Sequence, residues 1–153
     1  MNKNIQIKKR HVSVVIFYDK KHVLLQNRKS INKAGEEWGF FGGSLEEGES
    51  PEQALVREVG EELGYKIKDY RYIGEYENQY FNKKTQSETI VKREIFISSI
   101  TTELMGKKVV EGDGFDIFTL DEAMKLKIIP GDIEVLKIFK QYRCKDSSAS
   151  YRK

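Results

Sequence analysis

The sequence predicts an α/β protein in which helices cover both faces of a mixed β-sheet. Segments rich in β-branched and aromatic residues, at 11–18, 22–28 and 89–100, are typical of strands. They lie before and after a strongly capped helix at 51–63, and an amphipathic helix is predicted at 131–142. Strands on both sides of a central helix, with a second helix at the end, favour one layered domain.

Length and composition fit a folded domain. The chain has 153 residues, of which 39% are hydrophobic and 33% are charged. A chain of this length can bury a core, and these fractions differ from those of disordered proteins. No linker or repeat divides the sequence, so we place a single domain at 1–145. The serine-rich, polar segment 146–153 is expected to be a disordered C-terminal tail.

Cysteine usage and hydropathy favour a cytoplasmic protein. Cys144 is the single cysteine, so no disulfide framework can form. The first eleven residues are too polar for a secretory signal, and no apolar run reaches membrane-spanning length. We therefore expect no membrane partner.

The charge pattern argues against a duplex nucleic-acid partner. The net charge is only +3, and the basic residues form short clusters such as 8–10. These clusters are too small for a duplex nucleic-acid surface, and solvated lysines are the simplest interpretation. Alternatively, some of them steer a polyanionic small molecule toward the acidic helix described below.

The first strands are predicted to form a hairpin. Residues 11–18 and 22–28 are separated by a three-residue turn, so they are expected to pair with each other. A loop with a glycine follows, and a brief apolar strand is predicted at 38–41, immediately before two glycines. This strand leads into the central helix.

The second half of the chain is predicted to contain further strands and helices. Two long strands at 69–81 and 89–100 are separated by a turn at 82–85. One or two short strands are expected within 107–119, and a short helix at 121–126. Together with the hairpin, these strands form the expected mixed sheet.

The central helix has clear start and stop signals. Ser50 is a good N-cap, and Gln53 completes a capping box with it. Pro51 suits the first helical position, and Gly64 suits a left-handed C-cap. An apolar stripe that must pack on a core is formed by Leu55, Val59 and Leu63.

The same helix carries a cluster of carboxylates. Glu58, Glu61 and Glu62 have the spacing i, i+3, i+4, which places them on one side of the helix, where like charges repel. The segment 43–65 contains seven acids and one base, although the whole chain is positive. A solvated acidic face is one interpretation. A bound divalent cation is the other, because clustered carboxylates are hard oxygen ligands.

The spacing of these residues resembles a known family motif. Gly43 is followed after five residues by Glu49, and after seven more by the run 57–65, REVGEELGY. This resembles the Nudix box, G-x5-E-x7-R-E-U-x-E-E-x-G-U, with every fixed position matched. Tyr65 is a mild departure, since a bulky aliphatic residue is usual there. The resemblance implies the Nudix fold, an α/β/α sandwich with a mixed β-sheet, and hydrolysis of a nucleoside diphosphate linked to another group.

The resemblance also implies roles for the residues of the box. Glu58 and Glu62 would be the principal ligands of Mg²⁺ or Mn²⁺, with Glu61 as a further ligand or as a base acting through water. Gly43 would offer its backbone carbonyl, where a side chain would keep the cation away. Arg57 would pair with Glu49 and fix its orientation. A plain surface ion pair is the alternative for this arginine.

Two acids outside the box could act as a general base. Glu111 lies in a glycine-flanked loop, near the place where some family members have a catalytic glutamate; an ordinary turn acid is an equal alternative. Glu94 lies in a predicted strand beside Arg93, and a charge pair between these neighbours is the simpler interpretation.

Three residues are predicted to contact the substrate. Arg28 ends the second strand, where MutT-type members have a basic residue near the phosphates; a solvated arginine is the alternative. Phe41 replaces the proline of the common F-P-G-G sequence. Asp132 follows Pro130-Gly131, and an N-cap is its first interpretation. In MutT-type enzymes a polar residue near this place reads a purine edge.

The resemblance predicts a nucleoside triphosphate substrate, oxidised or not, because the chain is short and its loop is close to the MutT pattern. The alternatives are ADP-ribose or another nucleotide sugar, a dinucleoside polyphosphate and a 5′-triphosphate RNA end. A non-catalytic nucleotide sensor is the alternative of another class. A homodimer is left open, since tyrosines at 70, 72, 76 and 80 could pack in the sheet or at a dimer face.

Overall fold

The structure, a computed structural model, describes residues 5–32, 35–109 and 112–150, with side chains up to residue 145. Within these residues the chain forms one seven-stranded sheet with the strand order β3-β2-β1-β6-β5; β4 also pairs with β1, and β7 with β2. The strands are β1 Gln6–Tyr18, β2 His22–Asn27, β3 Trp38–Gly39, β4 Phe41–Ser44, β5 Arg71–Asn82, β6 Ser87–Ser99 and β7 Phe115–Thr119. The helices are α1 Pro51–Leu63, α2 Thr102–Met105, α3 Leu120–Ala123 and α4 Asp132–Ser150.

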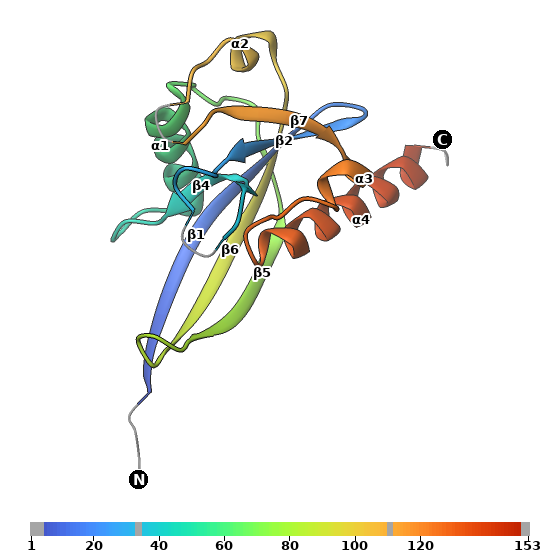
Figure 1. Cartoon of the computed structure of the whole chain (residues 1–153). Helices are drawn as coiled ribbons and strands as arrows, with labels where there is room; N and C mark the ends of the chain where they lie inside the picture. The colour runs from blue at the N-terminus through green and yellow to red at the C-terminus, as the bar shows by residue number, and fades with distance from the viewer. Residues whose placement is uncertain (1–4, 33–34, 110–111, 151–153) are drawn as a thin grey trace.

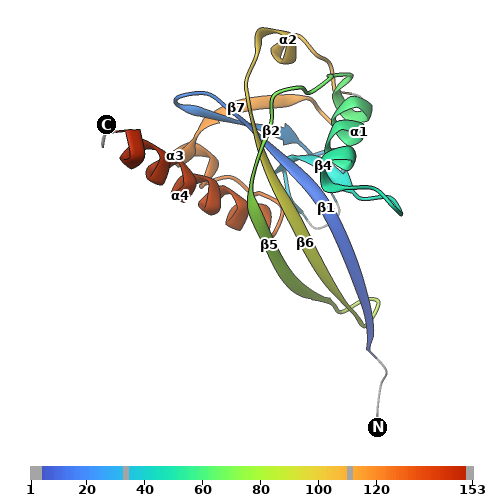
Figure 2. The ribbon, with the colours of Figure 1, turned by 180° about the vertical axis from the view of Figure 1, so that it is seen from behind.

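The predicted mixed sheet with helices on both faces is confirmed. Strands β1 and β6 are parallel over their whole length, whereas the other pairs are antiparallel. Helices α1 and α4 lie on opposite faces of the sheet (Figures 1 and 2). The predicted hairpin is also present, with Tyr18 of β1 opposite Val23 of β2.

Alternation along β1 divides the core into two layers. Val12, Val14 and Ile16 pack with residues of α4 such as Leu136. Residues of opposite parity, including Phe17, pack with α1. Successive side chains of a strand point to opposite faces, so one apolar strand serves both helical layers.

Several boundaries differ from those predicted. β1 begins at Gln6, before the predicted start at 11, because its polar first half pairs in parallel with β6. The strand predicted at 38–41 is divided: β3 pairs with β2, and β4 pairs with β1. The short helix α2 was not predicted.

The C-terminal helix also differs from the prediction. α4 continues to Ser150, beyond the domain boundary placed at 145, where a disordered tail was expected. No glycine or proline follows Gly131, so the sequence contains no strong helix breaker to end α4 there. Among the described helices, none is long and apolar enough to cross a membrane.

Candidate active site

Helix α1 is fixed at both ends and along its length. The Ser50 hydroxyl accepts from the Gln53 backbone N–H, and the Gln53 side chain accepts from the Ser50 N–H, so the predicted capping box is present. Gly64 has the left-handed conformation of a C-cap, with φ of 61°. The buried Ser13 hydroxyl donates to the Pro51 carbonyl at 2.7 Å, which attaches the start of α1 to β1. The helix therefore holds its carboxylates in a defined position relative to the sheet.

Arg57 is the centre of a network of charged groups. Its guanidinium donates two hydrogen bonds to Glu49, at 2.8 and 2.9 Å, and one to Glu58 at 2.8 Å. It also donates to the Ser44 carbonyl at 2.9 Å. The hydrogen bonds from Arg57 to Glu49, with one from the Glu46 N–H, lower the pKa of Glu49 to about 2, and the Glu49 and Glu58 carboxylates raise the pKa of Arg57. The expected pairing of Arg57 with Glu49 is thus present as a bidentate contact.

The Glu58 carboxylate lies against Gly43 of β4. A Cβ atom at position 43 would come within 2.6 Å of both Glu58 oxygens. The absence of a side chain at this position is therefore what allows the carboxylate to approach the backbone. The backbone conformation itself would admit other residues, since Gly43 is not among the positive-φ glycines.

The other two glutamates lie on the same helix. Glu62 accepts from the Gly42 backbone N–H at 3.1 Å, so it also contacts the glycine pair. Glu61 is more exposed, with 60% of its side chain accessible, and lies 3.4 Å from Arg57. The three acids named from the sequence thus share one helix, and two of them contact the Gly42–Gly43 segment directly.

These residues fit a hard divalent cation. Among the described residues, no group of three His, Cys, Asp or Glu side chains is arranged as a ready metal cluster. In the present arrangement the Glu58 carboxylate is paired with Arg57, and the Glu62 carboxylate accepts a hydrogen bond from the Gly42 N–H. However, both carboxylates approach the glycine pair, where a Cβ at 43 would fill the space, and carboxylate and carbonyl oxygens are the ligands that Mg²⁺ takes. Glu58, Glu62 and the Gly43 carbonyl could therefore hold such an ion.

A second polar cluster lies on the α4 side of the sheet. Asp132, the first residue of α4, is only 3% exposed. Its carboxylate accepts from the Phe40 backbone N–H at 3.2 Å and from the Arg93 Nε at 3.1 Å. Burial raises the pKa of Asp132, whereas the charge of Arg93 and the N–H of Phe40 oppose that change. The carboxylate thus joins α4 to β6 and to the residue between β3 and β4.

Arg93 of β6 was not identified from the sequence as a site residue. It is 5% exposed, donates to the Pro130 carbonyl at 3.0 Å and contacts the Asn78 side chain. A Cβ at Gly131 would come within 2.5 Å of its guanidinium. The expected pairing of Arg93 with its neighbour Glu94 is wrong, because adjacent residues of a strand point to opposite faces. Glu94 instead lies 3.5 Å from His11 and accepts from Tyr72 at 3.3 Å.

Arg28 follows directly after β2, as expected, and lies near the Asp132 cluster. Its Nε donates to Glu36 at 3.4 Å, and its side chain also donates to Gln26 at 3.2 Å. Its charge acts on the Asp132 carboxylate. Arg28 is 19% exposed and is therefore a half-buried residue rather than a freely solvated arginine.

Phe41 does not become part of the described site. Phe41 is 1% exposed and packs edge-on against Phe115 in the core on the α1 side. The predicted substrate contact of Phe41 is therefore replaced by a packing role, because side chains alternate and its neighbour Phe40 faces the other layer. Glu111 lies outside the described residues.

A single short segment connects the two clusters. Along 40–43, the Phe40 N–H donates to Asp132, the Gly42 N–H donates to Glu62, and Gly43 lies under Glu58. Three residues of extended strand span about 10 Å. The acidic helix and the buried aspartate therefore lie at the two ends of one short segment, although they are on opposite faces of the sheet.

The fold and the site define an α/β protein built around a capped acidic helix whose carboxylates contact a pair of glycines. Its sequence matches the NUDIX domain family over residues 7–139, and the chain belongs to this family, as the residues of the box predicted. A Proteus vulgaris protein named 8-oxo-dGTP diphosphatase is 41% identical over 61 residues, which are 39% of this chain and 54% of that protein. The chain thus matches only about half of the length of this relative.

Two further proteins extend the similarity. A Bacillus subtilis (strain 168) protein, to which the same activity is assigned provisionally, is 30% identical over 113 residues, 69% of this chain and 68% of that protein. The structure of the E. coli dihydroneopterin triphosphate pyrophosphohydrolase superposes with a TM-score of 0.67. That comparison covers 88% of this chain and 97% of the other at 22% identity, and confirms the fold.

Proposed function

We propose that this protein is a divalent-metal-dependent hydrolase that cleaves the diphosphate linkage of a nucleoside triphosphate, oxidised or not, to give the monophosphate. The observation that carries the proposal is the segment 40–43, which contacts the carboxylates of α1 at one end and Asp132 at the other. A span of about 10 Å suits a nucleotide whose phosphates lie near α1 and whose base lies near Asp132. The relatives named as 8-oxo-dGTP diphosphatases support this substrate class.

The residues of α1 would act by holding Mg²⁺ or Mn²⁺. Glu58, Glu62 and the Gly43 carbonyl would be its ligands, and the ion would neutralise phosphate oxygens that the acidic helix otherwise repels. Glu61, the most exposed of the three glutamates, would be a further ligand or would accept a proton from the attacking water. Arg57 would keep Glu49 and Glu58 in place through the hydrogen bonds described above.

The other polar cluster would recognise the nucleoside. Asp132 carries a buried carboxylate whose oxygens, besides accepting from the Phe40 N–H and Arg93, have acceptor capacity for a donor on a base edge. Arg28, half-buried nearby, would contact a phosphate or the base. ADP-ribose or another nucleotide sugar, a dinucleoside polyphosphate and a 5′-triphosphate RNA end are the alternative substrates.

The test is turnover of a nucleotide panel with Mg²⁺, followed by identification of both products. We expect a nucleoside monophosphate from at least one compound, and more than 100-fold lower kcat for Glu58→Gln and Glu62→Gln. Glu52→Gln is the matched control, because it removes an exposed acid from the first turn of the same helix. If the Glu58 and Glu62 variants turn over like the parent, the proposed metal site is wrong. Tight nucleotide binding without turnover would instead indicate a sensor.

A further inference from the structure

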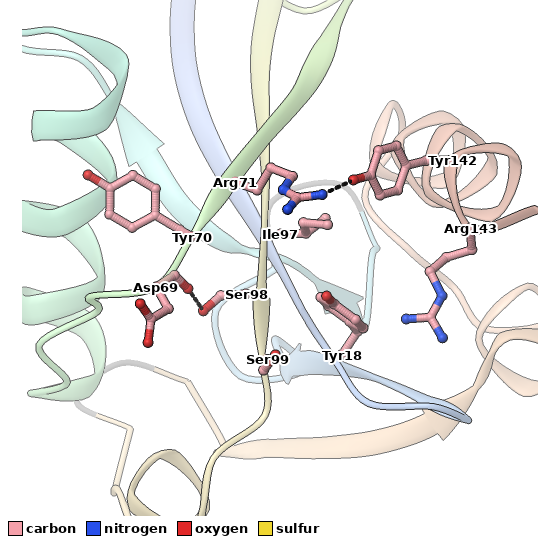
Figure 3. Close-up of a pocket in the computed structure, with 9 residues that line it drawn as sticks. All are labelled: Tyr18, Asp69, Tyr70, Arg71, Ile97, Ser98, Ser99, Tyr142 and Arg143. Atoms are coloured by element: carbon pink, nitrogen blue, oxygen red, sulfur yellow. Dashed lines mark hydrogen bonds between the residues drawn. The ribbon is translucent and has the colours of Figure 1, made fainter. Parts of the chain in front are cut away.

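The two ends of the long strands β1, β5 and β6 are covered differently. At one end α4 lies on the sheet, and Arg71 at the start of β5 donates to the Tyr142 hydroxyl of α4 (Figure 3). The helix begins at Asp132, level with Arg93 of β6, and runs from there toward Arg71. In the other direction from Arg93, the three strands extend past both α1 and α4 (Figures 1 and 2). The last rows of the sheet are therefore left uncovered by the described helices.

The register of the strands shows which side chains share the α4 side of this extension. Val91 of β6 packs in the core layer of α4, and residues paired with each other across a sheet point to the same side. In the outermost of these rows, Thr89 lies between Lys8 of β1 and Tyr80 of β5. The residues of this surface, here called the distal face, are Lys8, Arg10, Asn78, Tyr80, Thr89 and Val91.

The outer strands form the accessible part of the distal face. Thr89 in the middle is only 6% exposed, whereas Tyr80 is 45% exposed, and Lys8 and Arg10 are exposed as well. Arg10 donates to the Ser44 hydroxyl at 3.1 Å, which uses one of the five N–H groups of a guanidinium. The distal face thus presents an aromatic ring on β5 and two cations on β1 to solvent.

No acid belongs to the distal face. β1 contains no acid, and the acids of β5 and β6 all occupy the alternate positions that point to the α1 side, namely Glu75, Glu77, Glu88 and Glu94. On that side Lys92 pairs with Glu75 at 3.2 Å. In contrast, Lys8 and Arg10 form no ion pair with any acid in the described part of the chain. The distal face therefore has a net positive charge.

This combination of groups suits a single strand of nucleic acid. Lys8 and Arg10 are about 7 Å apart along β1, because alternate residues of a strand are separated by twice its rise. That spacing is close to the distance between successive phosphates of an extended single strand. Tyr80 lies two strands away, at about 10 Å, where the bases of a strand whose phosphates follow β1 would lie. Proteins that bind single strands combine basic groups along the phosphates with aromatic rings on which bases stack.

We propose that the distal face binds single-stranded nucleic acid, with phosphates along Lys8 and Arg10 and a base on Tyr80. Charge complementarity favours this partner over a second copy of the same face, which would oppose positive charge to positive charge. The face continues through Asn78 into the Asp132 cluster, so a bound strand leads to the candidate nucleoside site. The binding itself does not depend on hydrolysis at α1, because none of the residues of the distal face belongs to that helix.

The test is fluorescence anisotropy of a labelled oligouridylate of about ten nucleotides, titrated with the full chain in metal-free buffer at about 0.15 M salt. We expect saturable binding of the single strand and weaker binding of the same strand annealed to its complement, because a duplex hides the faces of its bases. Equal affinity for the two forms, or no saturation up to about 100 μM protein, would overturn the proposal. So would a dimer in sedimentation that Tyr80→Leu dissociates, since a second copy would then cover the face.

Two variants on β1 test the phosphate contacts. Lys8→Gln and Arg10→Gln should each weaken binding about fourfold at this salt concentration and lower the slope of log Kd against log salt by about 0.7, the values for one phosphate contact to a single strand. Lys9→Gln is the matched control, because Lys9 is also exposed but points to the α1 side. It should leave the affinity within about twofold of the parent. Equal weakening in the Lys8 and Lys9 variants would show general attraction to a basic surface and contradict a site on the distal face.

A variant on β5 tests the stacking contact. Tyr80→Leu should weaken binding about fivefold or more and leave the salt slope unchanged, because it removes a ring rather than a charge. Phe81→Leu is the matched control, since Phe81 is the next residue and is 44% exposed but points to the α1 side. Its affinity should equal that of the parent. If the two variants bind alike, no base stacks on Tyr80 and the proposed site is wrong.

Discussion

The carboxylate of Glu58 lies directly against Gly43, with both of its oxygens within 2.6 Å of where a Cβ atom at position 43 would be. The helix and the strand are therefore fitted to each other at the point where the sequence predicts a metal ion. The contact links a backbone feature of β4 to a side chain of α1, so either partner can be changed to test it.

Gly43→Ala should lower kcat by about 100-fold, because the added methyl group displaces the Glu58 carboxylate and small misplacements of catalytic groups have effects of this size. Steady-state kinetics with the preferred nucleotide measures the effect. Gly60→Ala is the control, since nothing lies within 4 Å of a Cβ there. This change, inside α1, should raise the free energy of unfolding by about 0.5–1 kcal/mol and leave kcat unchanged.

Glu49 should titrate far below an ordinary glutamate. Two hydrogen bonds from Arg57 and one from the Glu46 N–H lower its pKa from 4.5 to about 2. The folded state thus binds this proton less tightly than the unfolded chain, so the contribution of Glu49 to stability is present above pH 4.5 and is lost as the pH falls toward 2. NMR titration of the side-chain carboxyl carbon measures the pKa directly. In Arg57→Gln the pKa should return toward 4.5, and an unchanged value would show that Arg57 is not its cause.

Removing the buried carboxylate of α4 should destabilise the protein strongly. Asp132→Ala leaves the Arg93 guanidinium, 5% exposed, without its counter-charge, a change that costs about 3–5 kcal/mol of unfolding free energy. Urea denaturation measures the loss. Glu134→Ala is the matched control, because it removes an acid of the same helix whose pairing with Lys137 is exposed, and it should cost less than about 1 kcal/mol. A similar cost for the two variants would contradict the view that Asp132 supports the fold.

Phe41 should affect stability rather than substrate recognition. Its ring is fully buried against Phe115, so Phe41→Ala should cost about 3–5 kcal/mol through the cavity that it leaves. The milder Phe41→Leu should retain the fold and leave the KM for nucleotide within about twofold of the parent. A large rise in KM with unchanged thermal stability would restore the substrate-contacting role expected from the sequence.

The elements with local signals were predicted well from the sequence. Helix α1 begins after Ser50 and ends at Gly64 as its capping residues predicted, because caps depend on hydrogen bonds between residues close in the chain. The pairing of Arg57 with Glu49 was also predicted, because both residues are fixed positions of the motif. The roles in metal binding and catalysis given to the glutamates of α1 remain predictions.

Features that depend on distant pairing were not predictable in the same way. The polar first half of β1 forms a strand only because it pairs with β6, some eighty residues later in the chain. Arg93 was expected to pair with its sequence neighbour Glu94, whereas its buried partner Asp132 is 39 residues away in the chain. The substrate contact of Phe41 was predicted by comparison with a motif, although its burial depends on which face of β4 packs on α1.

The opposite orientations of Arg93 and Glu94 have a consequence for how β6 finds its place in the sheet. Sliding this strand by one residue would turn Glu94 toward Asp132 and bury two acids side by side, while Arg93 would lose its counter-ion. Electrostatics therefore adds a penalty for the misaligned sheet to the loss of apolar packing. The Arg93–Asp132 pair that borders the candidate nucleoside site thus also favours the observed register of β6 over a register shifted by one residue.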